Sequence, residues 1–264
     1  MAAEVSEEQT VRSRCKGGIK GHTEANVECT LSLLSKGRLE LLGQILSGSN
    51  AIFLTRVVAP EEEAQTLAVY KPGRGESPLW DFPRGTLCLR EVAAYLVSRA
   101  LGWPSVPPTV LRDGPYGIGA LQLYIDAIPH ANYFTFRQER RQDLMPVALF
   151  DLVTNNVDRK GGHLLLDRDG CIWAIDNALT FHPLPKLRTV IWDFAGEAIP
   201  SHYLADINRL QEQISTPSPL REALSTLLSA EEIAALRRRL TVLSESGVFP
   251  HPDPTRRQLP WPLV

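Results

Sequence analysis

Four charged residues, Lys71, Glu91, Asp158 and Asp176, stand at points where the sequence changes from one type of element to another. Lys71 ends an apolar run, and a lysine at the end of a buried strand is costly unless its ammonium group meets a phosphate or a carboxylate. Glu91 lies near the start of the next helical pattern, where a carboxylate can reach back to such a lysine. Each residue also has a simpler explanation, because the lysine can leave the sheet for water and the glutamate can stabilise a helix N-terminus.

The two aspartates lie in the second half of the chain. Asp158 occupies a polar, glycine-containing loop, where a carboxylate can orient or deprotonate a hydroxyl group that attacks a phosphate. It can also close an Asx-turn or pair with Arg159. Asp176 follows an apolar strand, and an acid there suits magnesium, which prefers oxygen ligands, or simply ends a hairpin. The order strand lysine, helix glutamate, loop aspartate and strand-end aspartate favours phosphoryl transfer over four unrelated structural roles.

The elements that position these residues begin with a sheet. Apolar runs and turn signals predict strands that start as an antiparallel meander. Five strands are expected, at residues 39–45, 51–58, 66–70, 106–111 and 120–125. A helix is expected between the third and fourth strands, at residues 87–101, with Gly102 at its C-terminal cap.

From about residue 140 the pattern is mainly helical. An apolar helix is predicted at 144–153, and capping patterns at Ser218 and Ser229 open two later helices. A short hairpin is expected at 163–166 and 172–175. A sheet with one helix, followed by a helical half, predicts an α+β fold with two lobes. We expect a flexible tail, an N-lobe, a C-lobe and a proline-rich extended tail at residues 1–28, 29–128, 129–248 and 249–264.

Composition narrows the class of protein. The chain has 264 residues, 44% of them apolar, and a formal net charge of −2, so a broad nucleic-acid-binding surface is not indicated. No apolar run is long enough to span a bilayer, and the N-terminal residues lack the pattern of a secretory signal. The four cysteines are widely spaced and fit no zinc motif. We therefore expect a cytoplasmic protein with reduced thiols and no transmembrane segment.

Several short motifs resemble a known group of kinases. The sequence TNNVDR at 154–159, together with AIDN at 174–177, resembles the catalytic and metal-binding segments of phosphatidylinositol 3-/4-kinases, especially the type II 4-kinases. REVAAYL at 90–96 is also similar to that group. More closely, the run from about residue 30 to 215 resembles a bacterial phosphatidylinositol-kinase-like family named for a Streptomyces member, of which DRKGGH at 158–163 and TVIW at 189–192 are typical.

This resemblance implies a bilobal protein-kinase-like fold that binds ATP and magnesium. Lys71 would hold the ATP phosphates and Glu91 would orient it. Asp158 would be the acid of the catalytic loop, and Asp176 the principal magnesium ligand. Adenine would be received by a hinge formed by Gln122, Leu123, Tyr124 and Ile125. The phosphates would be covered by the turn at residues 43–50, with Ser47, Gly48 and Ser49 at its tip.

Two departures from the group are visible. His163 stands five residues after Asp158, where these kinases usually carry an asparagine that binds a second magnesium ion. Imidazole is a poorer ligand for magnesium and a better one for softer metals, so manganese is an alternative and His163 is a candidate metal ligand. The glycines at 43 and 48 do not form a GxGxxG pattern, which is a milder departure because lipid-kinase-like loops often lack it.

Three functions agree with these observations. The first is an ATP- and metal-dependent phosphotransferase, whose hydroxyl-bearing acceptor is a protein, a lipid head group or a metabolite. The second is a nucleotide-binding pseudokinase that regulates a partner, which His163 favours and the presence of the four charged residues opposes. The third is transfer of AMP on the same fold. Lys186 and Arg188 follow Asp176 and can attract an anionic substrate or simply be solvated.

Overall fold

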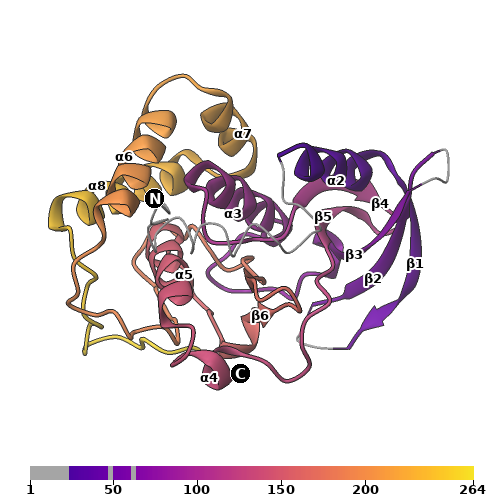
Figure 1. Ribbon diagram of the computed structural model, residues 1–264. Helices are drawn as coiled ribbons and strands as arrows, with labels where there is room; N and C mark the ends of the chain where they lie inside the picture. The colour runs from indigo at the N-terminus through magenta and orange to yellow at the C-terminus, as the bar shows by residue number, and fades with distance from the viewer. Residues whose placement is uncertain (1–23, 47–49, 61–63) are drawn as a thin grey trace, which may run out of the picture.

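The computed structural model describes residues 24–264 apart from 47–49 and 61–63. Figure 1 shows an antiparallel sheet on one side, a group of helices on the other, and helix α3 (Leu87–Leu101) between them. The predicted α+β architecture with a sheet-containing N-lobe and a mainly helical C-lobe is confirmed. Of the residues expected to cover the nucleotide, Ser47, Gly48 and Ser49 lie outside the described residues.

Five strands form the sheet in the order β1-β2-β3-β5-β4. They are β1 (Arg38–Ile45), β2 (Ile52–Val58), β3 (Gln65–Pro72), β4 (Thr109–Gly114) and β5 (Gly117–Leu123). All neighbouring pairs are antiparallel, and Lys71 lies opposite Ala120 of β5. The strand expected at 106–111 begins later, at Thr109, because Pro107 and Pro108 cannot donate hydrogen bonds to a neighbouring strand.

The predicted N-terminal tail is wrong for its last residues, because helix α2 (Glu24–Lys36) begins at Glu24. Residues 1–23 lie outside the described residues. Leu34 is fully buried in a small core with residues of β2, β3 and β5. Arg112 of β4 donates to the carbonyls of Leu34 and Gly37, both at 2.8 Å. Packing against the sheet therefore stabilises this helix, whose own apolar pattern is weak.

The C-lobe contains a small hairpin and six helical elements besides α3. These are α4 (Tyr133–Phe136), α5 (Arg141–Thr154), the 3-10 helix η3 (Gly161–His163), β6 (Leu164–Leu166), β7 (Ile172–Ala174), α6 (Ser201–Ser215), α7 (Pro219–Leu227) and α8 (Ala230–Ser246). Both predicted caps are present, since Ser218 accepts from the N–H of Arg221 and Ser229 forms a capping box with Glu232. Helix α5 begins before its predicted start, so Pro146 lies in its second turn rather than its first.

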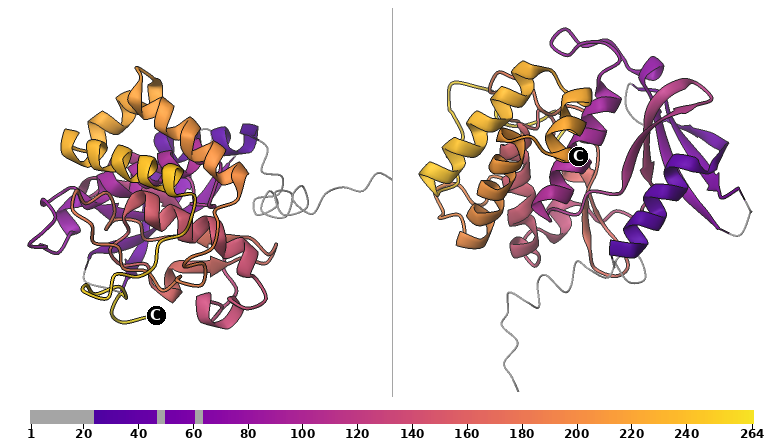
Figure 2. Two further views of the ribbon diagram at one scale, coloured as in Figure 1. Left: turned by 90° about the vertical axis from the view of Figure 1, so that its left-hand side faces the viewer. Right: turned by 90° about the horizontal axis from the view of Figure 1, so that it is seen from above.

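Helix α3 packs against the helices of the C-lobe as well as against strands β4 and β5 of the N-lobe. Its residues join one large apolar cluster with α5, α6, α7 and α8. Arg90 is 2% exposed and forms a buried ion pair with Glu232 of α8. Figure 2 shows α3 lying alongside the C-lobe helices in a second view. The predicted division at residue 128 therefore separates α3 from the C-lobe helices against which it packs, but keeps it with β4 and β5, which it also contacts.

The proline-rich segment after α8 has no helix or strand, as predicted, and it packs across the C-lobe. The N–H groups of Gly161 and Thr189 donate to the carbonyls of Leu263 and Gln258, at 2.7 and 3.1 Å. The segment thus lies against the loop that contains Asp158. None of the helices within the described ranges combines the length and apolar character that a membrane-spanning helix needs.

Candidate active site

The structure brings Lys71, Glu91 and Asp176 together between the two lobes. The ammonium group of Lys71 forms an ion pair with Glu91 and lies 3.4 Å from Oδ1 of Asp176. Strand β3 positions the lysine and helix α3 positions the glutamate. The aspartate follows strand β7, with Ile175 between them. The side chain of Glu91 is 1% exposed, whereas that of Asp176 is 45% exposed. Asp176 is therefore the member of this group that faces open space.

The charges of this group stabilise one another. Burial alone would lower the pKa of Lys71, but attraction by Glu91 and then by Asp176 raises it above its ordinary value. Burial would raise the pKa of Asp176, but Lys71 and then His163 hold it well below its ordinary value. The lysine is consequently charged and the aspartate ionised at neutral pH. A fixed cation beside an ionised, accessible carboxylate can hold phosphate oxygens and a metal ion.

Asp158 lies beside this group on the loop between α5 and η3. Burial raises the pKa of Asp158, while Lys160 opposes this effect and Asp176 adds to it. Oδ2 of Asp158 is 3.2 Å from the ammonium group of Lys160, so its ion-pair partner is Lys160 rather than the neighbouring Arg159. Sequence reasoning did not single out Lys160, although a cation two residues after a candidate acid is a detectable signal.

Arg159 has a different role, because its buried side chain holds the loop of Asp158 in place. Its side chain is fully buried and donates to Oδ1 of Asp151 at 3.0 Å and to the carbonyl of Ile175 at 2.7 Å. It also donates to Oδ1 of Asn177 at 2.6 Å. Asp151 in turn accepts from the hydroxyl of Thr189 at 3.0 Å. This network ties α5, the loop of Asp158 and the segment after Asp176 into one unit.

The backbone at Asp176 is in the left-handed region, with φ of 57°. Aspartate adopts this region more readily than most residues, but it still costs free energy and is found where the surroundings enforce it. Oδ2 of Asp176 lies 3.3 Å from Nε2 of His163. The N–H of Lys160 points to Nδ1 of His163 at 3.4 Å. The structure therefore places His163 in direct contact with the aspartate.

His163 is neutral in this setting, and its tautomer follows from its neighbours. Burial lowers the pKa of His163 to about 4, and Asp176 only partly opposes this. Because Nδ1 accepts from the N–H of Lys160, the proton of the neutral ring is on Nε2, where it faces Asp176. In this arrangement His163 donates to Asp176 and would have to change tautomer to bind a metal ion through Nε2.

The donor set fits one divalent metal ion held mainly by substrate phosphates. Within residues 24–264, apart from the two gaps, no group of three metal-binding side chains occurs. Magnesium in phosphoryl-transfer sites is usually bound by one or two carboxylates, with phosphate oxygens and water completing the coordination. The accessible carboxylate of Asp176 agrees with that pattern.

The connection between β3 and α3, residues 73–86, closes one side of the site. It contains the 3-10 helix η2 (Gly73–Gly75). The N–H of Ala51 donates to the carbonyl of Gly75 at 2.9 Å, and the N–H of Ser77 donates to Oδ1 of Asn50 at 2.8 Å. These bonds attach the connection to the end of the turn that was expected to cover the phosphates. Sequence reasoning missed this part because it has no periodic pattern.

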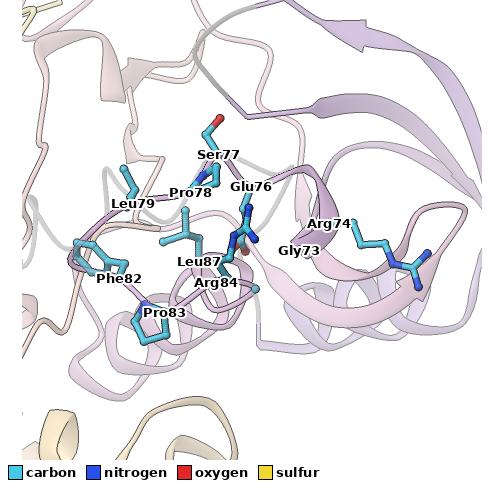
Figure 3. A pocket seen from close by; sticks show the side chains of 11 residues that line it. Gly73, Arg74, Glu76, Ser77, Pro78, Leu79, Phe82, Pro83, Arg84 and Leu87 are labelled. Atoms are coloured by element: carbon cyan, nitrogen blue, oxygen red, sulfur yellow. The ribbon is translucent and has the colours of Figure 1, made fainter.

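The same connection reaches across to the C-lobe. Phe82 packs in a buried cluster with Val157 and Ala178, and Asp81 forms an ion pair with Lys186 at 2.6 Å. A cavity of about 300 Å³ lies within the connection and beside the start of α3. Figure 3 shows the apolar side chains that line one side of it, Leu79, Phe82 and Leu87. The cavity is adjacent to Lys71 in the chain but contains none of the four charged residues.

Three of the four residues expected to form the adenine-binding hinge already donate hydrogen bonds to neighbouring residues of the protein. The side chain of Gln122 donates to the hydroxyl of Thr109 at 2.9 Å. The N–H groups of Leu123 and Tyr124 donate to the carbonyls of Pro108 and Leu67, at 2.9 and 3.0 Å. The N–H of Ile125 forms no hydrogen bond within the described part of the chain. Of these four residues, Ile125 is the one whose backbone donor is available to a ligand.

Comparisons with known proteins show which sequences and solved structures this chain resembles. No family model matches the chain. Protein Rv2133c of Mycobacterium tuberculosis is 40% identical over 266 residues, covering 88% of this chain and 94% of that protein. The chain belongs to the family of that protein. Phosphatidylinositol 4-kinase gamma 4 of rice, Oryza sativa subsp. japonica, is 25% identical over 173 residues, which is 53% of this chain but 30% of that kinase.

Solved structures show the same fold at low sequence identity. The structure of hydra Fam20 with sugar gives a TM-score of 0.55 at 17% identity, covering 89% of this chain and 93% of that one. The Golgi casein kinase with Mn/ADP bound gives a TM-score of 0.53 at 14% identity, covering 95% of this chain and 87% of that one. The chain therefore has a kinase-like fold.

Proposed function

We propose that this member of the Rv2133c family is an ATP- and divalent-metal-dependent phosphotransferase of the phosphatidylinositol 3-/4-kinase-like type. The observation that carries this proposal is the position of Lys71, paired with buried Glu91 and 3.4 Å from accessible Asp176. The likeness to a phosphatidylinositol 4-kinase and to a casein kinase with Mn/ADP bound supports it. The type of acceptor is a hydroxyl group near Asp158.

Each side chain has a task in such a transfer. Lys71 holds phosphate oxygens of ATP, and Glu91 keeps it in place. Asp158 orients the acceptor hydroxyl and takes its proton as the oxygen bonds to the γ-phosphorus. The bond from that phosphorus to the β,γ-bridging oxygen breaks, and ADP leaves. Asp176 would hold a divalent metal ion, which would offset the negative charge of the phosphates.

The proposal is tested with ATP labelled at the γ- or the α-phosphate, incubated with the protein, magnesium or manganese, and a cell extract. We expect the γ-label to reach an acceptor and the α-label to remain on the nucleotide. Asp158→Ala should reduce γ-transfer by about 10²- to 10⁴-fold, because the group that orients the hydroxyl is lost. ATP affinity, measured by calorimetry, should be retained in this variant.

Asp169→Ala is the matched control, because Asp169 is an exposed residue of the β6–β7 turn. It should transfer the γ-label as the wild type does. Transfer of the α-label instead would identify an AMP transferase. ATP binding without transfer of either label would favour a pseudokinase. Full γ-transfer by Asp158→Ala would mean that another residue accepts the proton of the acceptor hydroxyl.

A further inference from the structure

Arg188 lies beside the loop that contains Asp158, although thirty positions of sequence separate them. The N–H of Arg159 donates to the carbonyl of Arg188 at 2.9 Å, and the N–H of Val190 donates to the carbonyl of Arg159 at 3.1 Å. These bonds form a parallel bridge between Arg159 and Thr189. The two segments therefore run side by side, as neighbouring strands do.

This pairing decides which way the side chains point. Arg159 and Thr189 both contact Asp151 on the buried side, at 3.0 Å each. Successive side chains of paired extended segments point to opposite sides. Asp158 and Arg188, one position earlier in each segment, therefore share the other side, toward the candidate active site. The electrostatic effect of Arg188 on Asp158 agrees with this placement.

Arg188 differs from the other basic residue of its segment. Lys186 forms an ion pair with Asp81 at 2.6 Å and lies 4.4 Å from the ring centre of Trp80. Arg188 is partly buried, and its guanidinium forms no hydrogen bond or ion pair with any of the described residues. A guanidinium has five donors and suits two oxygens of one phosphate or carboxylate. An unpaired guanidinium beside a candidate catalytic acid is placed to meet such a group.

We propose that Arg188 binds an anionic group of the acceptor, a phosphate or a carboxylate next to the hydroxyl that Asp158 orients. This inference rests on the proposed phosphotransferase function and names its substrate class, an alcohol that already carries a negative charge. The γ-phosphate of ATP has its own partners in Lys71 and in a metal ion at Asp176. Arg188 is a specificity-determining residue on the acceptor side.

The test is a calorimetric titration of inorganic phosphate into protein saturated with magnesium and β,γ-imido-ATP. This analogue is not hydrolysed and fills the γ-phosphate position, so the added phosphate must bind elsewhere. We expect wild-type protein to bind phosphate and Arg188→Gln to bind it at least about tenfold more weakly. Arg188→Lys should bind phosphate with an intermediate affinity, because it keeps the charge but loses the planar guanidinium that can donate to two oxygens at once. Affinity for the analogue should not change in either variant.

Arg238→Gln is the matched control, since Arg238 is exposed on α8 and its loss changes the net charge equally. It should bind phosphate as the wild type does. Displacement of bound phosphate by glycerol 3-phosphate alone would indicate a soluble acceptor. Displacement by vesicles of phosphatidylcholine with phosphatidic acid would indicate a lipid head group.

The outcomes distinguish a failure of the proposed phosphotransferase function from a failure of the role of Arg188. If wild-type protein does not bind β,γ-imido-ATP, the proposed function fails and the role of Arg188 falls with it. If the analogue binds but phosphate does not, only the role of Arg188 is overturned. Equal phosphate affinity in wild-type protein and Arg188→Gln has the same consequence. In both of these cases the proposed phosphotransferase remains.

Discussion

Helix α3 and strand β1 belong to the same lobe in sequence but are held in very different ways. Arg90 of α3 is buried together with its partner Glu232 of α8, and their side chains are 2% and 9% exposed. The charges of β1 lie in water, and the side chains of Arg38 and Glu40 are 59% and 31% exposed. A buried charge is costly to leave without a partner, whereas an exposed pair contributes little.

The difference shows where the site is rigid. Glu91 is on α3, and α3 is fixed to the C-lobe by Arg90, which also donates to the carbonyl of Thr180 at 3.1 Å. The glutamate of the pair is therefore held by the packing of α3 on the C-lobe, while strand β3 supplies the lysine. Asn50 and Ala51, which precede strand β2, contact the connection after β3 through Ser77 and Gly75. Four variants can break or sharpen this comparison.

Arg90→Met should have the largest effect on stability. It leaves Glu232 buried without its partner, which costs about 3–5 kcal/mol of unfolding free energy. Urea denaturation at neutral pH measures the change. The double variant Arg90→Met/Glu232→Met should recover part of this loss, because no buried charge is then unpaired. A loss below about 1 kcal/mol in the single variant would mean that the pair is hydrated in solution.

His163→Asn should change how stability depends on pH. The pKa of His163 is lowered from 6.5 to about 4 in the folded protein. Between these values the unfolded chain binds more protons, so acidification destabilises the wild type by up to about 1.4 kcal/mol per pH unit. The variant should show a smaller loss of unfolding free energy between pH 6.5 and about pH 4.

His130→Asn is the control for this comparison, because His130 is exposed. It should keep the wild-type dependence on pH. Identical curves for wild-type protein and His163→Asn would contradict a buried, neutral histidine at this position.

Asp176→Asn should weaken magnesium-dependent nucleotide binding by about tenfold or more, equivalent to about 1.4 kcal/mol. The variant loses the ionised oxygen that faces a metal ion, and its fold should persist because the side chain is partly exposed. Calorimetry with ATP, with and without magnesium, measures this effect. Asp169→Asn should behave as the wild type. Unchanged magnesium dependence in a folded Asp176→Asn would place the metal elsewhere.

Arg38→Ala should have the smallest effect, below about 1 kcal/mol, because its ion pair with Glu40 is exposed and screened by salt. It removes an arginine from an ion pair, as Arg90→Met does, so the two variants compare the environments directly. Urea denaturation under the same conditions gives both values. A loss as large as that of Arg90→Met would remove the contrast between α3 and β1.

Much of the fold could be predicted from local pattern. The apolar runs that become strands, the caps at Ser218 and Ser229, and Gly102 after α3 are short-range signals, and the structure has them in place. Lys71, Glu91, Asp158 and Asp176 were named from residue type and position alone. Their convergence is a tertiary property, and the structure provides it for the ion pairs of Lys71.

The parts that sequence reasoning missed depend on long-range contacts. Helix α2 has one fully buried residue, Leu34, and is stabilised by the sheet rather than by its own pattern. The partner of Arg159 is Asp151, which belongs to an ordinary helical stretch. The distinction between Lys186 and Arg188 depends on Asp81, more than a hundred positions away. No spacing rule connects these residues.

The proline-rich segment that lies against the loop of Asp158 also determines the order in which parts of the chain can fold. The ribosome makes Gly161 and Thr189 before Gln258 and Leu263, whose carbonyls accept their N–H groups. Until these later residues have been made, both N–H groups lack the partners that they have in the folded protein. The sheet, α3 and α5 can form in the meantime, since all their residues have already emerged. The hydrogen bonds that hold the loop of Asp158 against this segment can therefore form only after Gln258 and Leu263 have been made.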